Sequence, residues 1–191
     1  MLKTLVILAS TREGRTGEKI ANWFMDQVNG KYPDFEFELV DLKELNLPWF
    51  ETGNPSAMDK KYNDEKIQQW SQKVDGADAF IVITPEYNHG YSAPLKNALD
   101  HLFPEWAKKP MAFVSYGGSA GGARSVEQLR QVAVELEMAP IRIGVHIVRA
   151  WSELDESGNL QNPAYAKMLE SLMQQLKWWG EALQTARQKP E

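Results

Sequence analysis

The chain alternates between strand-like and helix-like segments from end to end, and this alternation limits the folds that it can adopt. Residues 2–9 form a continuous aliphatic run, as expected of a strand that is buried on both faces. Four further strands are expected at 35–40, 78–83, 110–115 and 141–148. Helical patterns lie at 16–29, 62–75, 91–103, 120–137 and 164–184. Such alternation predicts an α/β fold with a parallel sheet and helices on both faces, because parallel strands need crossover connections.

Five strands that are joined by right-handed crossovers leave few topologies. Of the two common doubly wound sheets, the strand count favours the flavodoxin-like order 2-1-3-4-5. In that order the strand sequence reverses between the first and third strands, and ligands bind beyond the carboxyl ends of the strands at such a reversal. The loops that follow residues 9, 83 and 115 are therefore where we expect a binding site.

Composition narrows the classes of function. A chain of 191 residues, 43% of them hydrophobic, is expected to form one domain over residues 1–191. Because cysteine is absent, disulfide frameworks, thiolate-bound zinc, iron–sulfur clusters and cysteine nucleophiles are excluded. The net charge of −5 gives no basic surface for nucleic acid, and no segment approaches the roughly 20 apolar residues of a membrane span. We expect a cytoplasmic protein without nucleic-acid partner, membrane insertion or metal site, since the three histidines lack metal-ligand spacing.

The first loop, residues 10–17, places hydroxyls and arginines at the start of a helix, where partial positive charge and unpaired N–H groups favour an anion. A dinucleotide fold is a competing interpretation, because Asp41 ends the second strand where a ribose-binding acid would lie. That fold needs G-x-G-x-x-G, and only Gly14 and Gly17 occur here. The loop suits a terminal phosphate monoester better. The plainer alternative is a helix that is capped by Thr16, with solvated arginines nearby.

The second loop leaves the third strand in a stiff course, because Pro85 restricts its own backbone and that of the preceding residue. Tyr87 and Asn88 stand at its tip, where they can lie along a planar aromatic ligand. A turn that caps the next helix through Ser92 is compatible with that role. His89 is expected to make surface contacts rather than to donate a proton.

The third loop follows the fourth strand and is rich in glycine, with the sequence SYGGSAGGAR over residues 115–124. Paired glycines allow a flat ligand or another backbone to approach, and their N–H groups can form a concave set of donors. A glycine-rich helix start without any ligand fits this segment equally well.

Residues 83–100, with the sequence ITPEYNHGYSAPLKNALD, closely resemble the signature of the NAD(P)H-dependent FMN reductase family, which includes quinone, azo-dye and chromate reductases. The first loop is similar to the phosphate loop of that family, and the third loop to its third flavin-contacting segment. The three matches fall in the family's order within residues 1 to about 150. The resemblance implies FMN as cofactor, with NADPH or NADH as co-substrate.

The same resemblance implies which residues bind the cofactor. The residues around the phosphate are Ser10, Arg12, Arg15, Thr16 and Gly17. Along the ribityl chain and the ring lie Pro85, Glu86, Tyr87 and Asn88. The third segment contributes Tyr116, Gly117, Gly118 and Ser119, of which the last three line the other edge of the ring. Many family members carry serine and asparagine at the positions of Thr16 and Gly17. One side-chain donor to the phosphate is therefore expected to be missing here.

The implied reaction is hydride transfer from NAD(P)H through N5 of FMN to a small-molecule electron acceptor, in a ping-pong scheme. Because the flavin carries the hydride, we assign no catalytic side chain. Two alternatives stay open on the same fold: a flavodoxin-type electron carrier, against which the small net charge counts, and an interaction module without flavin.

The family also implies a homodimer or homotetramer, with flavin sites near the subunit boundary. Trp106, Trp151, Trp178 and Trp179 are candidate aromatic anchors for such a boundary. The longer loop 41–61 could be a lid, an interface or a packed crossover.

Overall fold

A computed structural model describes residues 1–51 and 56–189, and in that part of the chain five strands form one parallel sheet in the order β2-β1-β3-β4-β5. The strands are β1 (Leu2–Leu8), β2 (Phe35–Asp41), β3 (Ala79–Pro85), β4 (Pro110–Gly117) and β5 (Ala139–Val148). Each neighbouring pair runs parallel. The fold class and the flavodoxin-like strand order expected from the sequence are confirmed.

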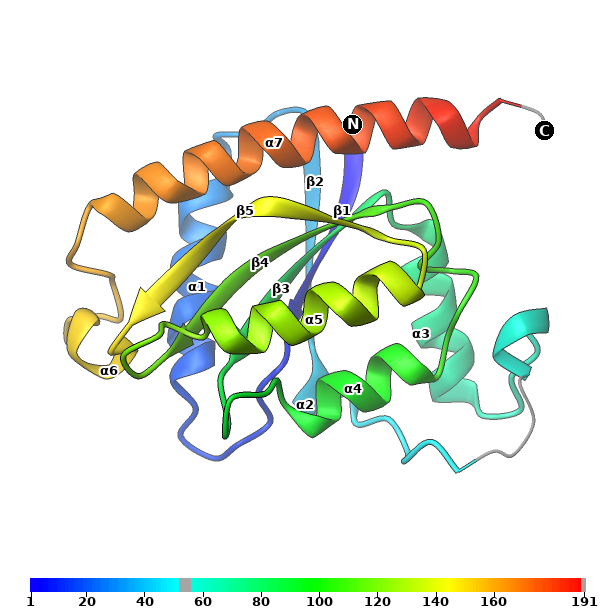
Figure 1. Cartoon of the computed structure of the whole chain (residues 1–191), viewed down its shortest axis with the longest axis horizontal. Helices are drawn as coiled ribbons and strands as arrows, with labels where there is room; N and C mark the ends of the chain where they lie inside the picture. The colour runs from blue at the N-terminus through cyan, green and yellow to red at the C-terminus, as the bar shows by residue number, and fades with distance from the viewer. Residues whose placement is uncertain (52–55, 190–191) are drawn as a thin grey trace.

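Helices cover both faces of the sheet (Figure 1). One face packs against α1 (Thr16–Val28) and α7 (Ala164–Arg187). The other packs against α3 (Glu65–Gly76), α4 (Ala93–Asp100) and α5 (Ala123–Glu135). The expected strands and helices are present, with ends that differ from the predicted ones by at most three residues. Within the described residues, no helix is long and apolar enough to cross a bilayer.

The aliphatic run of β1 explains why two cores form. Val6 and Leu8 join the core beneath α1 and α7, whereas Leu5 and Ile7 join the core on the opposite face. Side chains of a strand alternate between the two faces of a sheet, so a strand with a core on each side must be apolar at every position.

Three short elements in the connections were not predicted from the sequence. They are α2 (Leu42–Leu45), the 3₁₀ helix η1 (Ser56–Asp59) and α6 (Ala150–Glu153). Each is a single turn of helix, too short to show an apolar periodicity. Of these, α6 matters for function because it follows β5 at the edge of the sheet where the candidate loops meet.

Part of the loop 41–61 packs against α4. The side-chain oxygen of Asn97 accepts from the backbone N–H of Phe50 at 2.8 Å, and its amide donates to the carbonyl of Pro48 at 2.9 Å. Residues 48–50 are therefore packed against α4, and a role of the loop as a lid or an interface stays a prediction. Residues 52–55 of the loop lie outside the described residues.

Trp106 is not a surface anchor. Its side chain is fully buried, and its ring centroid lies 5.7 Å from that of Trp70 and 4.8 Å from that of Phe80. The expectation that Trp106 contributes to a subunit boundary is wrong, because the ring fills the core between α3, β3 and α4. Trp151 and Trp178, in contrast, are 67% and 63% exposed.

Candidate functional site

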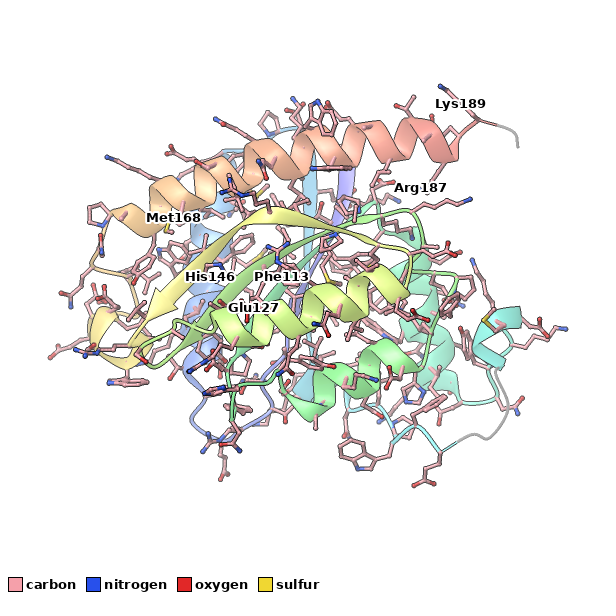
Figure 2. All side chains as sticks on the ribbon, viewed as in Figure 1. Phe113, Glu127, His146, Met168, Arg187 and Lys189 are labelled. Carbon is pink, nitrogen blue, oxygen red and sulfur yellow. The ribbon has the colours of Figure 1, made fainter. Side chains whose placement is uncertain are left out.

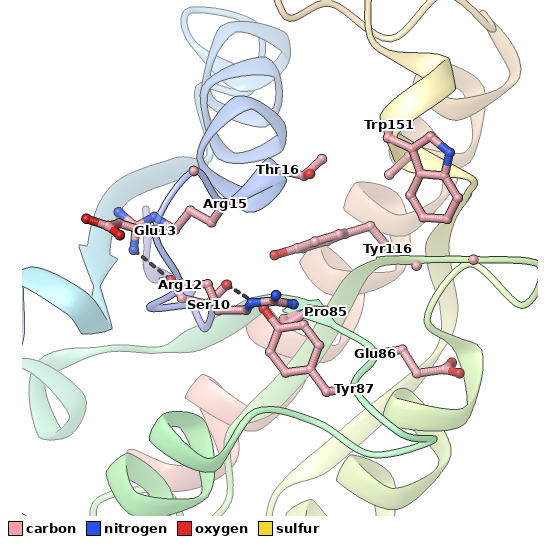
Figure 3. Close-up of a pocket in the computed structure, with 14 residues that line it drawn as sticks. Ser10, Arg12, Glu13, Arg15, Thr16, Pro85, Glu86, Tyr87, Tyr116 and Trp151 are labelled. Atoms are coloured by element: carbon pink, nitrogen blue, oxygen red, sulfur yellow. Dashed lines mark hydrogen bonds between the residues drawn. The ribbon is translucent and has the colours of Figure 1, made fainter.

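A cavity of about 350 Å³ lies at the carboxyl ends of β1, β3 and β4, where the strand order reverses (Figure 3). Its size falls within the usual range of small-molecule sites. Ten of the thirteen expected cofactor-binding residues line it: Ser10, Arg12, Arg15, Thr16, Pro85, Glu86, Tyr87, Tyr116, Gly117 and Gly118. The three loops selected from the sequence thus meet around one cavity.

Three expected residues lie outside the cavity wall. Asn88 is exposed in a tight turn with a backbone φ of +50°, and Ser119 is exposed in the third loop. Gly17 is buried in the first turn of α1. Direct contacts of these three with FMN stay predictions. His89, next to Asn88, is exposed as expected and its carbonyl accepts from Gln128 at 3.0 Å.

Sequence reasoning missed four lining residues: Glu13, Gly14, Ala150 and Trp151. The first two belong to the loop that was already singled out. Ala150 and Trp151 lie in α6, directly after β5, and Trp151 turns one side of its ring toward the cavity (Figure 3). An aromatic residue three positions after the end of the fifth strand was the available signal, because every strand of a parallel sheet ends at the same edge.

An ion pair with Asp41 fixes the course of the first loop. Arg15 Nη1 donates to Asp41 Oδ1 at 2.7 Å and to the carbonyl of Ser10 at 2.6 Å, while Nη2 pairs with the other carboxylate oxygen of Asp41. The Arg15 side chain is only 5% exposed, and the hydrogen bond to Asp41 raises its pKa. Asp41 therefore holds the loop, and the competing interpretation in which it binds a ribose loses its basis.

The start of α1 is left without a side-chain cap. Arg15 occupies the N-cap position in an extended conformation and makes no capping hydrogen bond, and Thr16 is the first helical residue. The alternative in which Thr16 caps this helix is wrong. Because α1 is 13 residues long and its first N–H groups lack a side-chain acceptor, its N-terminus can stabilise an anion in the cavity that Thr16 lines.

The Tyr116 hydroxyl provides an independent sign that a ligand completes this site. Tyr116 is 6% exposed, and within the described part of the chain its hydroxyl is a buried atom without hydrogen-bond partner. Burial raises the pKa of the phenol, so the group stays protonated and can donate. A buried donor without an acceptor is costly and needs an explanation. The residues present fit FMN, whose terminal phosphate would offer acceptors at this place.

The second loop is held against the first. Tyr87 Oη and Ser10 Oγ share a hydrogen bond of 2.8 Å, and the guanidinium carbon of Arg12 lies 5.3 Å from the centroid of the Tyr87 ring. The backbone of Tyr87 pairs with that of Gly90 in both directions, at 2.8 and 2.9 Å, which closes the turn. These contacts fix an aromatic ring on the wall of the cavity, close to its cationic end.

Glu86 directs its negative charge away from the cavity. Its carboxylate accepts from the Arg124 side chain, with 2.6 Å from Nε to Oε1, and from the Arg124 backbone N–H at 3.3 Å. Figure 3 shows the carboxylate directed away from the cavity. The Glu86 side chain is only 6% exposed, so this pair ties the second loop to the start of α5.

The third loop needs its glycines for close backbone packing. Gly122 has a φ of +83°, and a Cβ at this position would lie 2.7 Å from Ser115 Cβ. Ser115 Oγ donates to the carbonyl of Gly121 at 2.8 Å and shares a hydrogen bond of 2.7 Å with Nδ1 of His146, which Figure 2 shows between β5 and α5. Gly117 and Gly118 can therefore line the cavity with backbone alone.

Ser92 does not cap α4 with its side chain. It occupies the N-cap position, but its hydroxyl donates to the carbonyl of Ala9 at 2.7 Å. The hydroxyl thus links the start of α4 to the end of β1 instead of capping its own helix.

Among the described residues, no group of three or more histidine, aspartate and glutamate side chains could hold a metal ion.

The chain is similar to proteins of known family. The sequence matches the NADPH-dependent FMN reductase family over residues 2–152. It is 43% identical over 137 residues to an NAD(P)H-dependent FMN reductase of Schizosaccharomyces pombe, covering 71% of this chain and 68% of that protein. It is 36% identical over 159 residues to an NADPH:quinone oxidoreductase of Arabidopsis thaliana, covering 80% and 79%.

A solved structure supports the fold. The flavoenzyme NAD(P)H:(acceptor) oxidoreductase FerB of Paracoccus denitrificans superposes with a TM-score of 0.74 at 21% identity, covering 95% of this chain and 98% of that one. With the match over most of the sequence and the cavity at the strand-order reversal, the assignment follows: the chain belongs to the NADPH-dependent FMN reductase family, an oxidoreductase family that uses FMN and NAD(P)H.

Proposed function

We propose that the protein is a reductase that binds FMN in this cavity, oxidises NADPH or NADH and reduces a small-molecule acceptor such as a quinone, an azo compound, chromate or free flavin. The observation that carries the proposal is the distribution of groups around the cavity. Hydroxyls, arginines and an uncapped helix start gather at the first loop, whereas Pro85 and the backbone of Gly117 and Gly118 line the part formed by the other loops. A ligand with a phosphate at one end and a planar ring at the other suits this arrangement.

Bound FMN supplies the redox chemistry, since its ring accepts a hydride and passes electrons to an acceptor. The chain binds and orients it. Arg12 and Thr16 are expected to contact the phosphate, and Arg15 to hold the loop that presents them. Ser10 fixes the Tyr87 ring along the flavin. The two glycines of the third loop leave room for the ring's edge.

We propose a ping-pong order, because the nicotinamide and the acceptor must reach the same ring. We expect a bound ring to leave one face open, which the two substrates would occupy in turn. No side chain is proposed as acid or base. This scheme predicts parallel lines in double-reciprocal plots when the NADPH concentration is varied at several fixed quinone concentrations.

The protein is further proposed to act in the cytoplasm as a homodimer or homotetramer, with the whole chain as one domain. Exposed aromatic side chains support the assembly, because such residues are enriched at interfaces; Trp151 lies at the rim of the cavity and Trp178 on α7. Light scattering on the purified protein measures the oligomeric state, and a monomer at micromolar concentration contradicts it.

The central test is reconstitution. The purified chain is freed of flavin, titrated with FMN and supplied with NADPH or NADH and a panel of acceptors. We expect FMN binding and acceptor-dependent oxidation of the nicotinamide. FMN binding without such oxidation would favour the electron carrier, and no FMN binding at all would leave only the interaction module.

A further inference from the structure

The hydroxyl of Tyr116 occupies the place that a side chain at position 17 would need. A Cβ at Gly17 would overlap Tyr116 Oη and lie 3.0 Å from Cζ. Position 17 and the end of the tyrosine ring therefore exclude each other. The glycine that departs from the family's loop pattern is the residue that makes room for this hydroxyl.

We propose, on the basis of the proposed function, that Tyr116 Oη donates a hydrogen bond to the terminal phosphate of FMN. In this role it replaces the side-chain donor that is missing at Gly17. Tyr116 and Gly17 thus form a matched pair, which contributes to the preference of the site for phosphorylated flavin over riboflavin.

The first argument is that this hydroxyl makes no hydrogen bond to another described residue. It is buried and lacks a partner within the described residues, although it belongs to a residue that lines the cavity. Of the neighbouring groups, Ser10 Oγ is bonded to Tyr87 Oη and the terminal nitrogens of Arg15 to Asp41, while Arg15 Nε is a second buried atom without a hydrogen-bond partner in the described part of the chain. A phosphate oxygen is an acceptor that would satisfy the hydrogen-bonding capacity of this hydroxyl.

The second argument is the surrounding charge. The hydroxyl lies against the first turn of α1, the end of a helix where anions are favoured. Burial raises the pKa of the Tyr116 phenol, while the Ser10 hydroxyl and the charges of Arg15 and Arg12 lower it by less. The phenol therefore remains a neutral donor beside two cations. At such a place an anionic acceptor is favoured over an uncharged one.

Tyr116→Phe is the direct test, because it removes one oxygen and leaves the ring in the core. Affinities of the flavin-free protein for FMN and for riboflavin are measured by quenching of flavin fluorescence. A hydrogen bond to a charged group predicts that the variant binds FMN about 10- to 100-fold more weakly. Its affinity for riboflavin, which lacks the phosphate, should change little.

Tyr165→Phe is the matched control. Tyr165 is equally buried, but its hydroxyl accepts from the backbone N–H of Val148 and lies outside the cavity lining. This variant should leave the ratio of the FMN and riboflavin affinities unchanged. If it lowers that ratio as much as Tyr116→Phe does, the effect is a general loss of core packing and the proposal is overturned.

A rescue experiment tests the matched pair. In the Tyr116→Phe background the space beside Gly17 is freed, so Gly17→Ser can place a hydroxyl near the same phosphate. We expect the double variant to regain part of the preference for FMN, whereas Gly17→Ser alone should weaken FMN binding because its side chain meets Tyr116. Inorganic phosphate provides a second readout, since it should raise the melting temperature of the flavin-free wild type more than that of Tyr116→Phe.

The outcomes separate this inference from the proposed function. A wild-type protein that binds no FMN refutes both proposals, and one that binds FMN no better than riboflavin refutes the phosphate contact but leaves the reductase activity to its own test. A wild type that prefers FMN, together with a Tyr116→Phe variant that keeps the same preference, refutes the role of Tyr116 alone.

Discussion

The ion pair between Arg15 and Asp41 offers the sharpest test of how the phosphate loop is held. Asp41→Asn keeps the shape of the side chain and an oxygen that can accept from the backbone N–H of Lys43, now 2.9 Å away, but removes the charge. Arg15 is 5% exposed and Asp41 20% exposed, so the variant leaves a largely buried guanidinium without its counter-ion. Loss of one partner of a fully buried pair costs about 3–5 kcal/mol.

Partial exposure of Asp41 and the remaining amide oxygen reduce this cost, and we expect about 2–3 kcal/mol. In a chain of this length each kcal/mol lowers the melting temperature by about 2–4 °C, so the expected shift is about 5–10 °C. The measurement is thermal unfolding of the flavin-free protein. Glu38→Gln is the control, because Glu38 on the same strand pairs with Lys73 while both side chains are more than 40% exposed. Such exposed pairs contribute about 0–1 kcal/mol.

Equal shifts for Asp41→Asn and Glu38→Gln would refute the reasoning, since they would mean that the buried pair is no stronger than a solvated one. The ligand side is tested with Arg15→Ala and Arg12→Ala. Both should weaken FMN binding far more than riboflavin binding, but Arg12 is exposed and lacks a buried partner, so its removal should leave the melting temperature nearly unchanged. Equal losses for the two flavins would show that the first loop does not bind the phosphate.

Three further predictions concern the loops and the core. Gly122→Ala should destabilise the protein by about 2–3 kcal/mol, because the new Cβ meets Ser115. Gly14→Ala is the control: Gly14 also has a positive φ, but no atom outside its chain neighbours lies within 4 Å of its Cβ position, so the cost should be only about 1 kcal/mol. Both are measured by urea unfolding, and similar costs would contradict the packing argument. Arg124→Ala should cost about 1–2 kcal/mol at neutral pH, because it leaves the buried Glu86 carboxylate unpaired, and no measurable loss would contradict the tie between the second loop and α5. Burial lowers the pKa of Lys109 to about 8, whereas its value in the unfolded chain is 10.5. Between these pH values the unfolded state binds more protons than the folded state, so the stability of the wild type relative to Lys109→Met should increase as the pH rises from 8 to 10. A stability difference that does not change over this pH range would refute the shift.

The fold was predictable because burial on two faces leaves a direct trace in sequence. Residues 2–9 and 110–115 are apolar or small at nearly every position, and the structure places both segments inside the sheet. The position of the site followed from the same pattern, since the strand order determines which loops meet. Ten residues on those loops then line one cavity.

Local propensity predicted two helix caps incorrectly. Thr16 and Ser92 are residue types that often cap helices, yet neither side chain caps its own helix. The Ser92 hydroxyl instead donates to Ala9, 83 positions away in the sequence. At Ser92 a tertiary partner at a strand end outcompetes the local one, and a pattern of neighbouring residues cannot reveal such a partner.

The same reasoning explains why the departure at Gly17 could be noticed from the sequence but not understood. The resemblance of the loop to its family implies a missing donor at position 17, and 99 positions separate Gly17 from the residue that fills the space. The two meet only because β3 alone separates β4 from β1, and because β4 turns Tyr116 toward the start of α1. The missing side chain at position 17 and the hydroxyl at position 116 therefore act as one feature of the folded chain. The effects of variants at these two positions on FMN affinity should be strongly non-additive.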